Sequence, residues 1–129
     1  MRVLASLIAG ATALLAHAAH AGPPPRKTPE LLEIGQVSFK LNCASCHGSS
    51  GEGDGVSAAS LNPRPRNFVT EPLEHGATAA RIFRTLREGV AGTAMIGFTF
   101  LPDEERWALA YYVLDLRARG KAAGKRSGR

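Results

Sequence analysis

The chain has 129 residues, of which 44% are hydrophobic, and it carries 16 Lys and Arg against 11 Asp and Glu, a formal charge of +5. This length and hydrophobic content favour one small globular domain with a single core. The basic surplus is modest and no aromatic residues interleave with it, which argues against a nucleic-acid-binding protein.

The first two dozen residues have the pattern of an export signal. Arg2 provides a short positive region, Val3 to Leu15 is apolar, and Ala19-His20-Ala21 resembles a cleavage site, with cleavage after Ala18 as the alternative. A membrane anchor is the weaker interpretation, because the apolar run is shorter than a spanning helix needs. We therefore expect a signal peptide over residues 1–21 and a periplasmic mature protein.

A proline-rich linker over residues 22–28 precedes the first predicted helix. Thr28 suits the N-cap and Pro29 the first helical position, so this helix should span Pro29–Asn42. The helical period places five residues on one face: Leu31, Ile34, Gly35, Ser38 and Phe39. Glycine is unfavourable inside a helix, so Gly35 indicates close approach by another helix.

The stretch Cys43-Ala44-Ser45-Cys46-His47 reads C-x-x-C-H, the attachment motif of c-type haem. Thiols at this spacing can reach the two vinyl groups of one porphyrin edge, and the adjacent histidine can bind the iron. A zinc site would need a second Cys or His pair, and a redox dithiol a thioredoxin-like βαβ pattern; the sequence has neither. The motif predicts one covalent haem c attached to Cys43 and Cys46, with its iron bound by His47.

The rest of the chain reads as loops and two further helices. The segment 48–55 has four glycines in eight residues, and prolines extend the segment 61–68. The next helix should run from about Thr78, as N-cap, to Glu88, with Gly89 as its terminator. Its buried stripe should contain Ile82, Phe83, Leu86 and Val90. No alternation typical of β-strands occurs, so the predicted fold class is all-α.

The last helix should begin near Pro102 or Asp103, with three acids in its first turn. It should end near residues 117–119, which closes a domain over residues 29–119 and leaves a flexible basic tail over residues 120–129. The basic residues at this end are Arg117, Arg119, Lys121, Lys125, Arg126 and Arg129. A solubilising terminus is the simpler explanation, and a docking arm for an acidic partner is the alternative.

Met95 is the predicted second axial ligand of the iron. It is the only methionine after Met1, and it lies 48 residues beyond His47 in an irregular loop. A thioether in a loop is less typical of core packing than one on a helical stripe. His75, in a polar stretch before the second helix, is the alternative ligand, and an ordinary buried methionine is the structural alternative.

From about residue 33 to residue 116 the chain resembles the small, single-haem class I c-type cytochromes of bacterial periplasms. The matching motifs, in order, are Gly35-x-x-x-Phe39, Cys43-Ala44-Ser45-Cys46-His47-Gly48, Gly51-x-Gly53-Asp54-Gly55, Leu61-x-Pro63-x-Pro65-x-x-Phe68, Ile82-Phe83-x-x-Leu86-x-x-Gly89, Gly92-Thr93-Ala94-Met95 and Leu101-x-Asp103-Glu104-Glu105-x-Trp107. The resemblance implies a cytochrome c fold of three to four helices around one haem, with the first and last helices crossing. The residues expected at this crossing are Gly35, Phe39, and Tyr111 or Tyr112.

The resemblance also implies that a proline carbonyl accepts the Nδ1 proton of His47, with Pro65 as the first choice and Pro63 as the second. We expect an apolar shell around the haem formed by Leu61, Phe68, Ile82, Leu86, Ile96 and Phe98. The candidates to contact the haem propionates are Arg64, Arg66, Asn67 and Trp107. Surface solvation is the alternative for the two arginines, and core packing is the alternative for Trp107.

The predicted function is one-electron transfer between periplasmic redox proteins, with His47 and Met95 as axial ligands. No enzymatic activity is expected, because no acid, base or second metal is placed beside the iron. We expect a monomer or a subunit of a redox complex, without a membrane span after signal removal. The alternatives are an electron-transfer subunit of a larger periplasmic dehydrogenase or reductase, and a haem-based sensor in which a gas replaces Met95.

Overall fold

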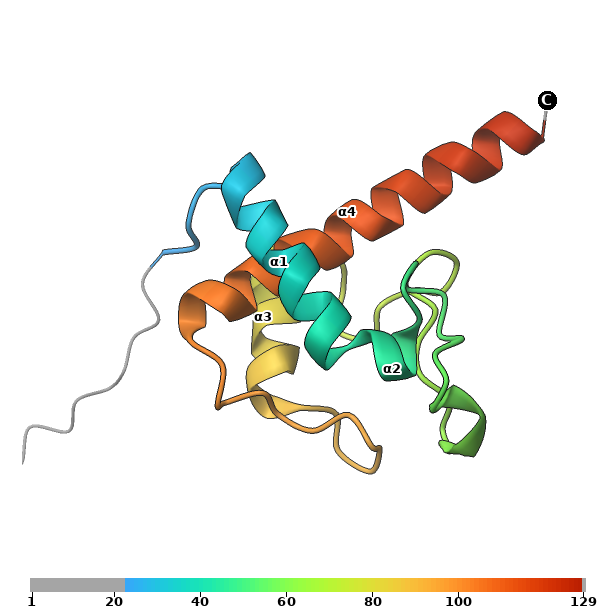
Figure 1. The fold of residues 1–129 in the computed structure, drawn as a ribbon, viewed down its shortest axis with the longest axis horizontal. Helices are drawn as coiled ribbons and strands as arrows, with labels where there is room; N and C mark the ends of the chain where they lie inside the picture. Colours follow the sequence, from blue (N-terminus) through green and yellow to red (C-terminus); the bar gives the residue numbers. More distant parts are fainter. Residues whose placement is uncertain (1–22, 129) are drawn as a thin grey trace, which may run out of the picture.

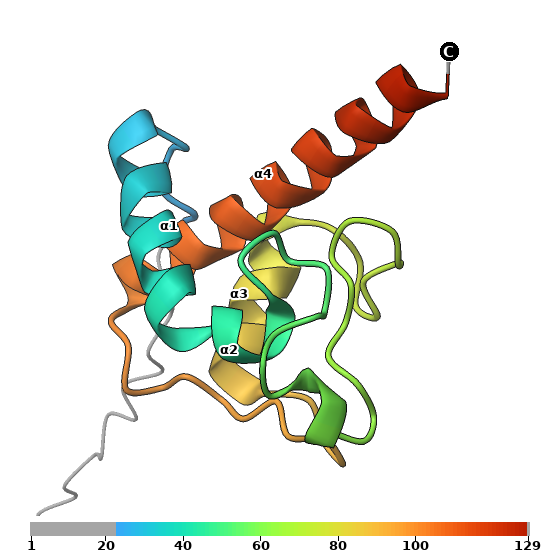
Figure 2. The same cartoon turned by 45° about the vertical axis from the view of Figure 1, so that its right-hand side comes forward.

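The computed structural model describes residues 23–128, so the predicted signal peptide lies outside the described residues. Over this range the chain is all-helical and contains no strand, as predicted. The elements in order are α1 (Pro29–Asn42), α2 (Ala44–His47), the short 3₁₀ helix η1 (Ala58–Ser60), α3 (Ala79–Glu88) and α4 (Asp103–Ser127). Long loops connect the elements between α2 and α4, and these loops surround the site described below (Figures 1 and 2).

The first and last helices cross at the centre of the fold (Figures 1 and 2). At the crossing, a Cβ atom added to Gly35 would overlap the carbonyl oxygen of Ala108 and come within 2.9 Å of the Tyr112 Cβ. The ring of Phe39 packs on that of Tyr112, with centroids 5.3 Å apart. The predicted crossing at Gly35 is therefore confirmed, and Tyr112 is its aromatic partner.

The other expected aromatic residue, Tyr111, has a different partner. Its hydroxyl donates a hydrogen bond to the carbonyl oxygen of Pro25, at 2.7 Å. Lys27 lies 3.9 Å from Asp115 in an ion pair, so a second contact joins the same two segments. The proline-rich segment before α1 is thus attached to α4.

α3 packs on α4 and has the bounds that its end signals predict. The hydroxyl of Thr78 accepts a hydrogen bond from the Arg81 N–H, and Gly89 ends the helix with a φ of 73°. The side chains that α3 buries are Ile82, Phe83 and Leu86. The Phe83 ring stacks on that of Trp107, with centroids 4.2 Å apart. This core packing replaces the propionate contact expected of Trp107.

Ile34 is a correction to the predicted buried face of α1. It is 41% exposed, whereas the other four residues of that face are buried. α4 covers the side of α1 that contains Gly35, and Ile34 lies beside this contact. As a result, α1 has an apolar face that α4 leaves uncovered.

The end of α4 is a second correction. The helix continues through Gly120 to Ser127, where the sequence predicted a flexible tail. Gly120 packs against Val69, and the following Lys, Ala and Arg residues are strong helix formers, so the helix continues. Arg117, counted with the basic tail, is buried. Within the described range, no helix has the length and apolar character to cross a membrane.

Candidate functional site

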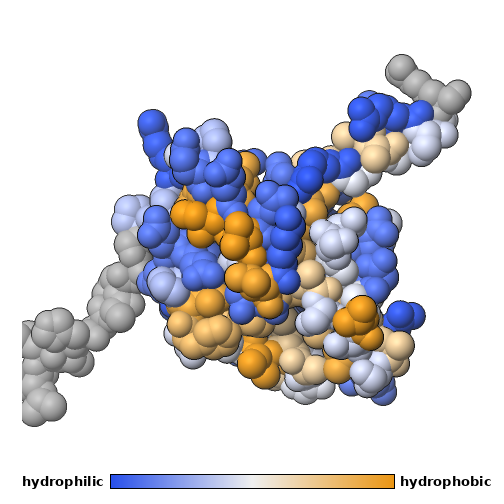
Figure 3. Space-filling view, in the orientation of Figure 1, coloured by the Kyte–Doolittle hydropathy of each residue, from blue (hydrophilic) through white to orange (hydrophobic). Residues whose placement is uncertain are grey.

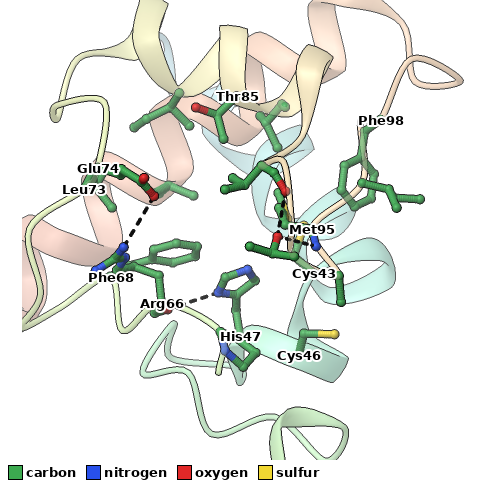
Figure 4. Close-up of a pocket in the computed structure, with 18 of the residues that line it drawn as sticks. Cys43, Cys46, His47, Arg66, Phe68, Leu73, Glu74, Thr85, Met95 and Phe98 are labelled. Carbon is green, nitrogen blue, oxygen red and sulfur yellow. Dashed lines mark hydrogen bonds and ion pairs between the residues drawn. The ribbon is translucent and has the colours of Figure 1, made fainter. Parts of the chain in front are cut away.

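A cavity of about 260 Å³ lies among α1, α2, α3 and the loops that connect them (Figure 4). All six side chains of the predicted apolar shell line it, although Ile96 is 64% exposed. Protein interiors are close-packed and rarely contain voids larger than a water molecule. A cavity of this size and lining therefore suits a bulky, mostly apolar group.

The two cysteines reach this cavity from the junction of α1 and α2 (Figure 4). Cys43 follows the last residue of α1 and is buried, whereas Cys46 lies within α2 and is half-buried. Burial, with a smaller contribution from the charge of Cys46, raises the pKa of the Cys43 thiol to about 12. Both thiols are free, which leaves each sulfur available for a thioether bond.

His47 is buried, and its Nδ1 atom lies 3.1 Å from the carbonyl oxygen of Arg66 (Figure 4). A carbonyl oxygen can only accept, so Nδ1 carries the proton and donates it. Burial lowers the pKa of His47, and the hydrogen bond to Arg66 only partly opposes this effect. The ring is therefore neutral at pH 7, with a lone pair on Nε2, which is the form that binds a metal.

The identity of the acceptor corrects the expectation of a proline carbonyl. Successive carbonyl groups of an extended chain point in roughly opposite directions. The carbonyl oxygen of Pro65 lies against Gly53, and that of the next residue, Arg66, faces His47. Pro65 and Pro63 both line the cavity, but neither accepts the histidine proton.

Phe68 and Arg117 complete the environment of the histidine. The Phe68 ring stacks on the His47 ring, with centroids 4.3 Å apart and planes 20° apart. The buried guanidinium of Arg117 donates hydrogen bonds to the carbonyl oxygens of Phe68 and of Glu71, the second at 2.8 Å. α4 thereby holds the loop that carries both Phe68 and the Arg66 carbonyl. The sequence has no local signal for this tether.

Met95 lines the cavity from the loop between α3 and α4 (Figure 4). Its N–H donates to the hydroxyl of Thr93 at 3.0 Å, and its carbonyl oxygen accepts from the Val90 N–H at 2.8 Å. These bonds fix the loop on both sides of the thioether. The alternative ligand, His75, also lines the cavity but is exposed, and its carbonyl oxygen accepts from Arg81 at 2.9 Å.

Only two of the four residues expected at the propionates line the cavity, Arg64 and Arg66. The guanidinium of Arg66 forms an ion pair with Glu74 at 3.7 Å (Figure 4) and another with Glu71 at 3.3 Å. Arg64 is exposed beside it. Both arginines and the acidic partners of Arg66 therefore lie on the side of the cavity formed by the loop that follows η1.

Asn67 corrects the same expectation. Its side-chain oxygen accepts hydrogen bonds from the N–H groups of Val69, at 2.8 Å, and Thr70, at 3.0 Å. This is the local turn that Asn commonly forms. The turn leads the chain from the Arg66 carbonyl into Phe68, so Asn67 shapes the loop instead of lining the cavity.

A site built from protein ligands alone does not form around the cysteines. Within residues 23–128, no group of three or more His, Cys, Asp and Glu side chains could hold a metal ion. The zinc alternative thus lacks the ligands that it needs. The site instead suits a c-type haem. It offers two thiols and a neutral imidazole as donors, and an apolar cavity surrounds them.

Residues 32–117 match the Cytochrome c family. The chain belongs to this family. The cofactor of this cytochrome c is accordingly a covalent c-type haem with its iron, and the predicted fold class is confirmed. Cys43, Cys46 and His47 all line the cavity; the two cysteines would hold the haem covalently, and His47 would bind its iron.

A solved structure is similar to this cytochrome c. It is a chain of the "Kuenenia stuttgartiensis reducing HAO-like protein complex Kustc0457/Kustc0458", with 34% sequence identity and a TM-score of 0.68. The similar region covers 74% of the present chain and 47% of that chain, so the present chain spans about half of its length. No curated protein matches the chain.

Proposed function

We propose that this cytochrome c is an exported, periplasmic one-electron carrier whose iron is bound by His47 and Met95. One observation carries the proposal: the neutral His47 ring and the single thioether after Met1 line the same apolar cavity as both cysteines. The haem, when bound, supplies an iron that alternates between the ferrous and ferric states.

Each residue of the site has a distinct part in this function. Cys43 and Cys46 retain the cofactor covalently, so it is not lost during repeated encounters with partners. The Arg66 carbonyl orients the His47 ring and increases its basicity. The thioether of Met95 favours ferrous iron and raises the reduction potential relative to a second nitrogen ligand. The apolar lining acts in the same direction, because it disfavours the additional charge of the ferric state.

Visible absorption spectra of the haem-loaded protein test the ligand assignment. The oxidised wild type should show the weak long-wavelength band of a sulfur–iron bond. Met95→Ala should lose this band, and the reduced variant should bind carbon monoxide at neutral pH. His75→Ala is the matched control, and it should retain both the band and the resistance to carbon monoxide.

A band that survives in Met95→Ala would contradict the assignment. Loss of the wild-type spectrum in His75→Ala would show that His75, and not Met95, is the second axial ligand. Carbon monoxide binding by the reduced wild type would favour the sensor function over the carrier.

The pattern of residues 1–21 supports export, since it is typical of a signal peptide. The c-type haem supports it as well, because its attachment fits an oxidising compartment. The intact mass of the protein from a periplasmic fraction tests it. The expected mass is that of the chain from residue 22 plus one haem. A haem-loaded protein that retains residues 1–21 in the cytoplasm would contradict the proposal.

A second function is favoured by the similar solved structure, which belongs to a protein complex. In that case the cytochrome would be the electron-transfer subunit of a larger dehydrogenase or reductase. Gel filtration of a native extract distinguishes the two functions. Co-elution of the haem protein with a reductase or dehydrogenase activity favours the subunit, and elution at the size of the free chain favours the carrier.

A further inference from the structure

The outer face of α1 carries an apolar stripe. Ile34, Val37 and Leu41 recur at helical spacing and are 41%, 58% and 78% exposed. Figure 3 shows this hydrophobic band over α1, with hydrophilic side chains along both of its sides. The opposite face of the same helix is buried against α4. The stripe is therefore an ordered apolar surface, fixed in place by the helix crossing beneath it.

Two opposite charges accompany the stripe. Glu33 precedes its centre and Lys40 follows it, and both are exposed. Among the ion pairs formed within residues 23–128, none involves either side chain. On a helix of 3.6 residues per turn, residues seven apart lie about 20° from one another. Glu33 and Lys40 thus share one flank of the stripe, Ile34 and Leu41 share the other, and Val37 lies between them.

This arrangement is complementary to itself. If two copies of α1 pack antiparallel about a two-fold axis at Val37, Ile34 of each copy meets Leu41 of the other. On the other flank, Glu33 of each copy meets Lys40 of the other. A two-fold interface requires that every contact occurs twice with the same pair of residues, and both pairs satisfy this condition. The antiparallel orientation also keeps the acidic N-terminal turns of the two helices apart.

The surface beside the stripe can receive a side chain. A shallow, open depression of the surface lies next to Ile34 and Val37. Ser38 also lines it, together with three acidic residues, Glu30, Glu33 and Glu105. In the antiparallel pair, Leu41 of the second copy lies at the level of Ile34 and can pack over this depression. Lys40 of the second copy then approaches the same acidic group.

We propose that the outer face of α1 is the interface of a symmetric antiparallel homodimer of this cytochrome c. Three apolar side chains per copy make a small interface, of the size that gives weak and reversible association. The expected state is therefore monomeric at low concentration and dimeric in the micromolar to millimolar range. This extends the expectation of a simple monomer, and it is independent of which protein donates the electron.

Sedimentation velocity of the haem-loaded protein over a wide concentration range is the first test. Wild type should shift reversibly from monomer to dimer. Val37→Asp places two carboxylates at the axis and should weaken association at least tenfold. Val56→Asp is the matched control, because Val56 is 95% exposed and lies outside α1. It should associate like wild type.

A charge exchange tests the orientation of the two helices. Glu33→Lys and Lys40→Glu should each weaken the dimer, since each creates two like-charged contacts. The double variant restores both pairs with reversed signs and should associate like wild type. All of these positions are on the surface, and the haem spectrum confirms that each variant is folded.

Three results would overturn the proposal. The first is a wild type that stays monomeric at every concentration. The outer face of α1 would then be a binding surface for a different protein. The second is association that Val37→Asp does not weaken. The third is a double charge variant that associates no better than the single variants, because the antiparallel pairing would then be wrong.

Discussion

The proton of His47 is positioned by a backbone atom, the carbonyl oxygen of Arg66. A hydrogen bond to the second nitrogen of a metal-binding histidine fixes the orientation of the ring and increases its basicity as a ligand. A backbone acceptor cannot be removed by substitution of its own side chain, so its position depends on how the loop is held. The loop is held by Arg117, through the carbonyl oxygens of Phe68 and Glu71.

Arg117→Met is therefore expected to destabilise the haem-loaded protein by about 2–4 kcal/mol, because charged donors to two carbonyl oxygens are lost. Urea unfolding gives the free energy of unfolding. Arg119→Met is the control on the same helix. Arg119 pairs with Asp115 at 2.9 Å and is largely exposed, so its loss should cost less than about 1 kcal/mol. Equal losses for the two variants would show that Arg117 does not support the loop.

The residues of the site differ in how far the sequence reveals them. Cys43, Cys46 and His47 form a local motif, and their spacing alone places them together. The acceptor for His47 depends on the direction of one carbonyl group in an extended segment, and a shift of one residue moves it from Pro65 to Arg66. Such a register has no signature in residue type, because every residue has a carbonyl group.

The crossing of α1 and α4 depends on a single missing side chain. A Cβ atom at position 35 would meet the backbone of Ala108, and backbone cannot rotate away as a side chain can. The two helices would have to separate along their whole contact. That contact includes the packing of Phe39 on Tyr112, so the effect would spread beyond the substituted residue.

Gly35→Ala is expected to lower the free energy of unfolding by about 2–3 kcal/mol, since overpacking outweighs the better helix propensity of alanine. Gly124→Ala is the matched control, because nothing lies within 4 Å of its added Cβ. It should leave the free energy of unfolding unchanged or raise it by up to about 1 kcal/mol. Chemical denaturation measures both variants. A neutral Gly35→Ala would disprove the close crossing.

Helix ends and helix faces differ in how well they can be predicted. Thr28, Thr78 and Gly89 act within their own turn, so the bounds of α1 and α3 follow from the sequence. A glycine such as Gly120 commonly ends a helix. Here α4 continues past it, because Gly120 packs against Val69 and strong helix formers follow. The exposure of Ile34 depends on how much of α1 another helix covers, and this is a tertiary property.

For the molecule as a whole, the cavity makes the cofactor part of the core. Its lining includes residues from all four α-helices and from the two loops that flank α3, such as Phe39, Leu86 and Val113. Without a group among them, these apolar surfaces would face water or each other across a void, and a void of this size is costly. The folded state should therefore depend on haem attachment.

A Cys43→Ser/Cys46→Ser double variant, purified without haem, tests this dependence. We expect it to lose most of its far-ultraviolet helical signal and its cooperative thermal unfolding, because the apolar cavity then lacks the group that fills it. The single variants, which retain one thioether, should fall between it and wild type. A haem-free double variant that unfolds cooperatively at the wild-type temperature would contradict this prediction.

The crossing of the first and last helices also affects the order of events during synthesis. α1 emerges from the ribosome early, but its buried face has no partner until Ala108 and Tyr112 of α4 have been made. The central contact cannot form on a nascent chain that still lacks α4. Cys43 is part of the core that this crossing completes, so its sulfur stays accessible until α4 has packed on α1.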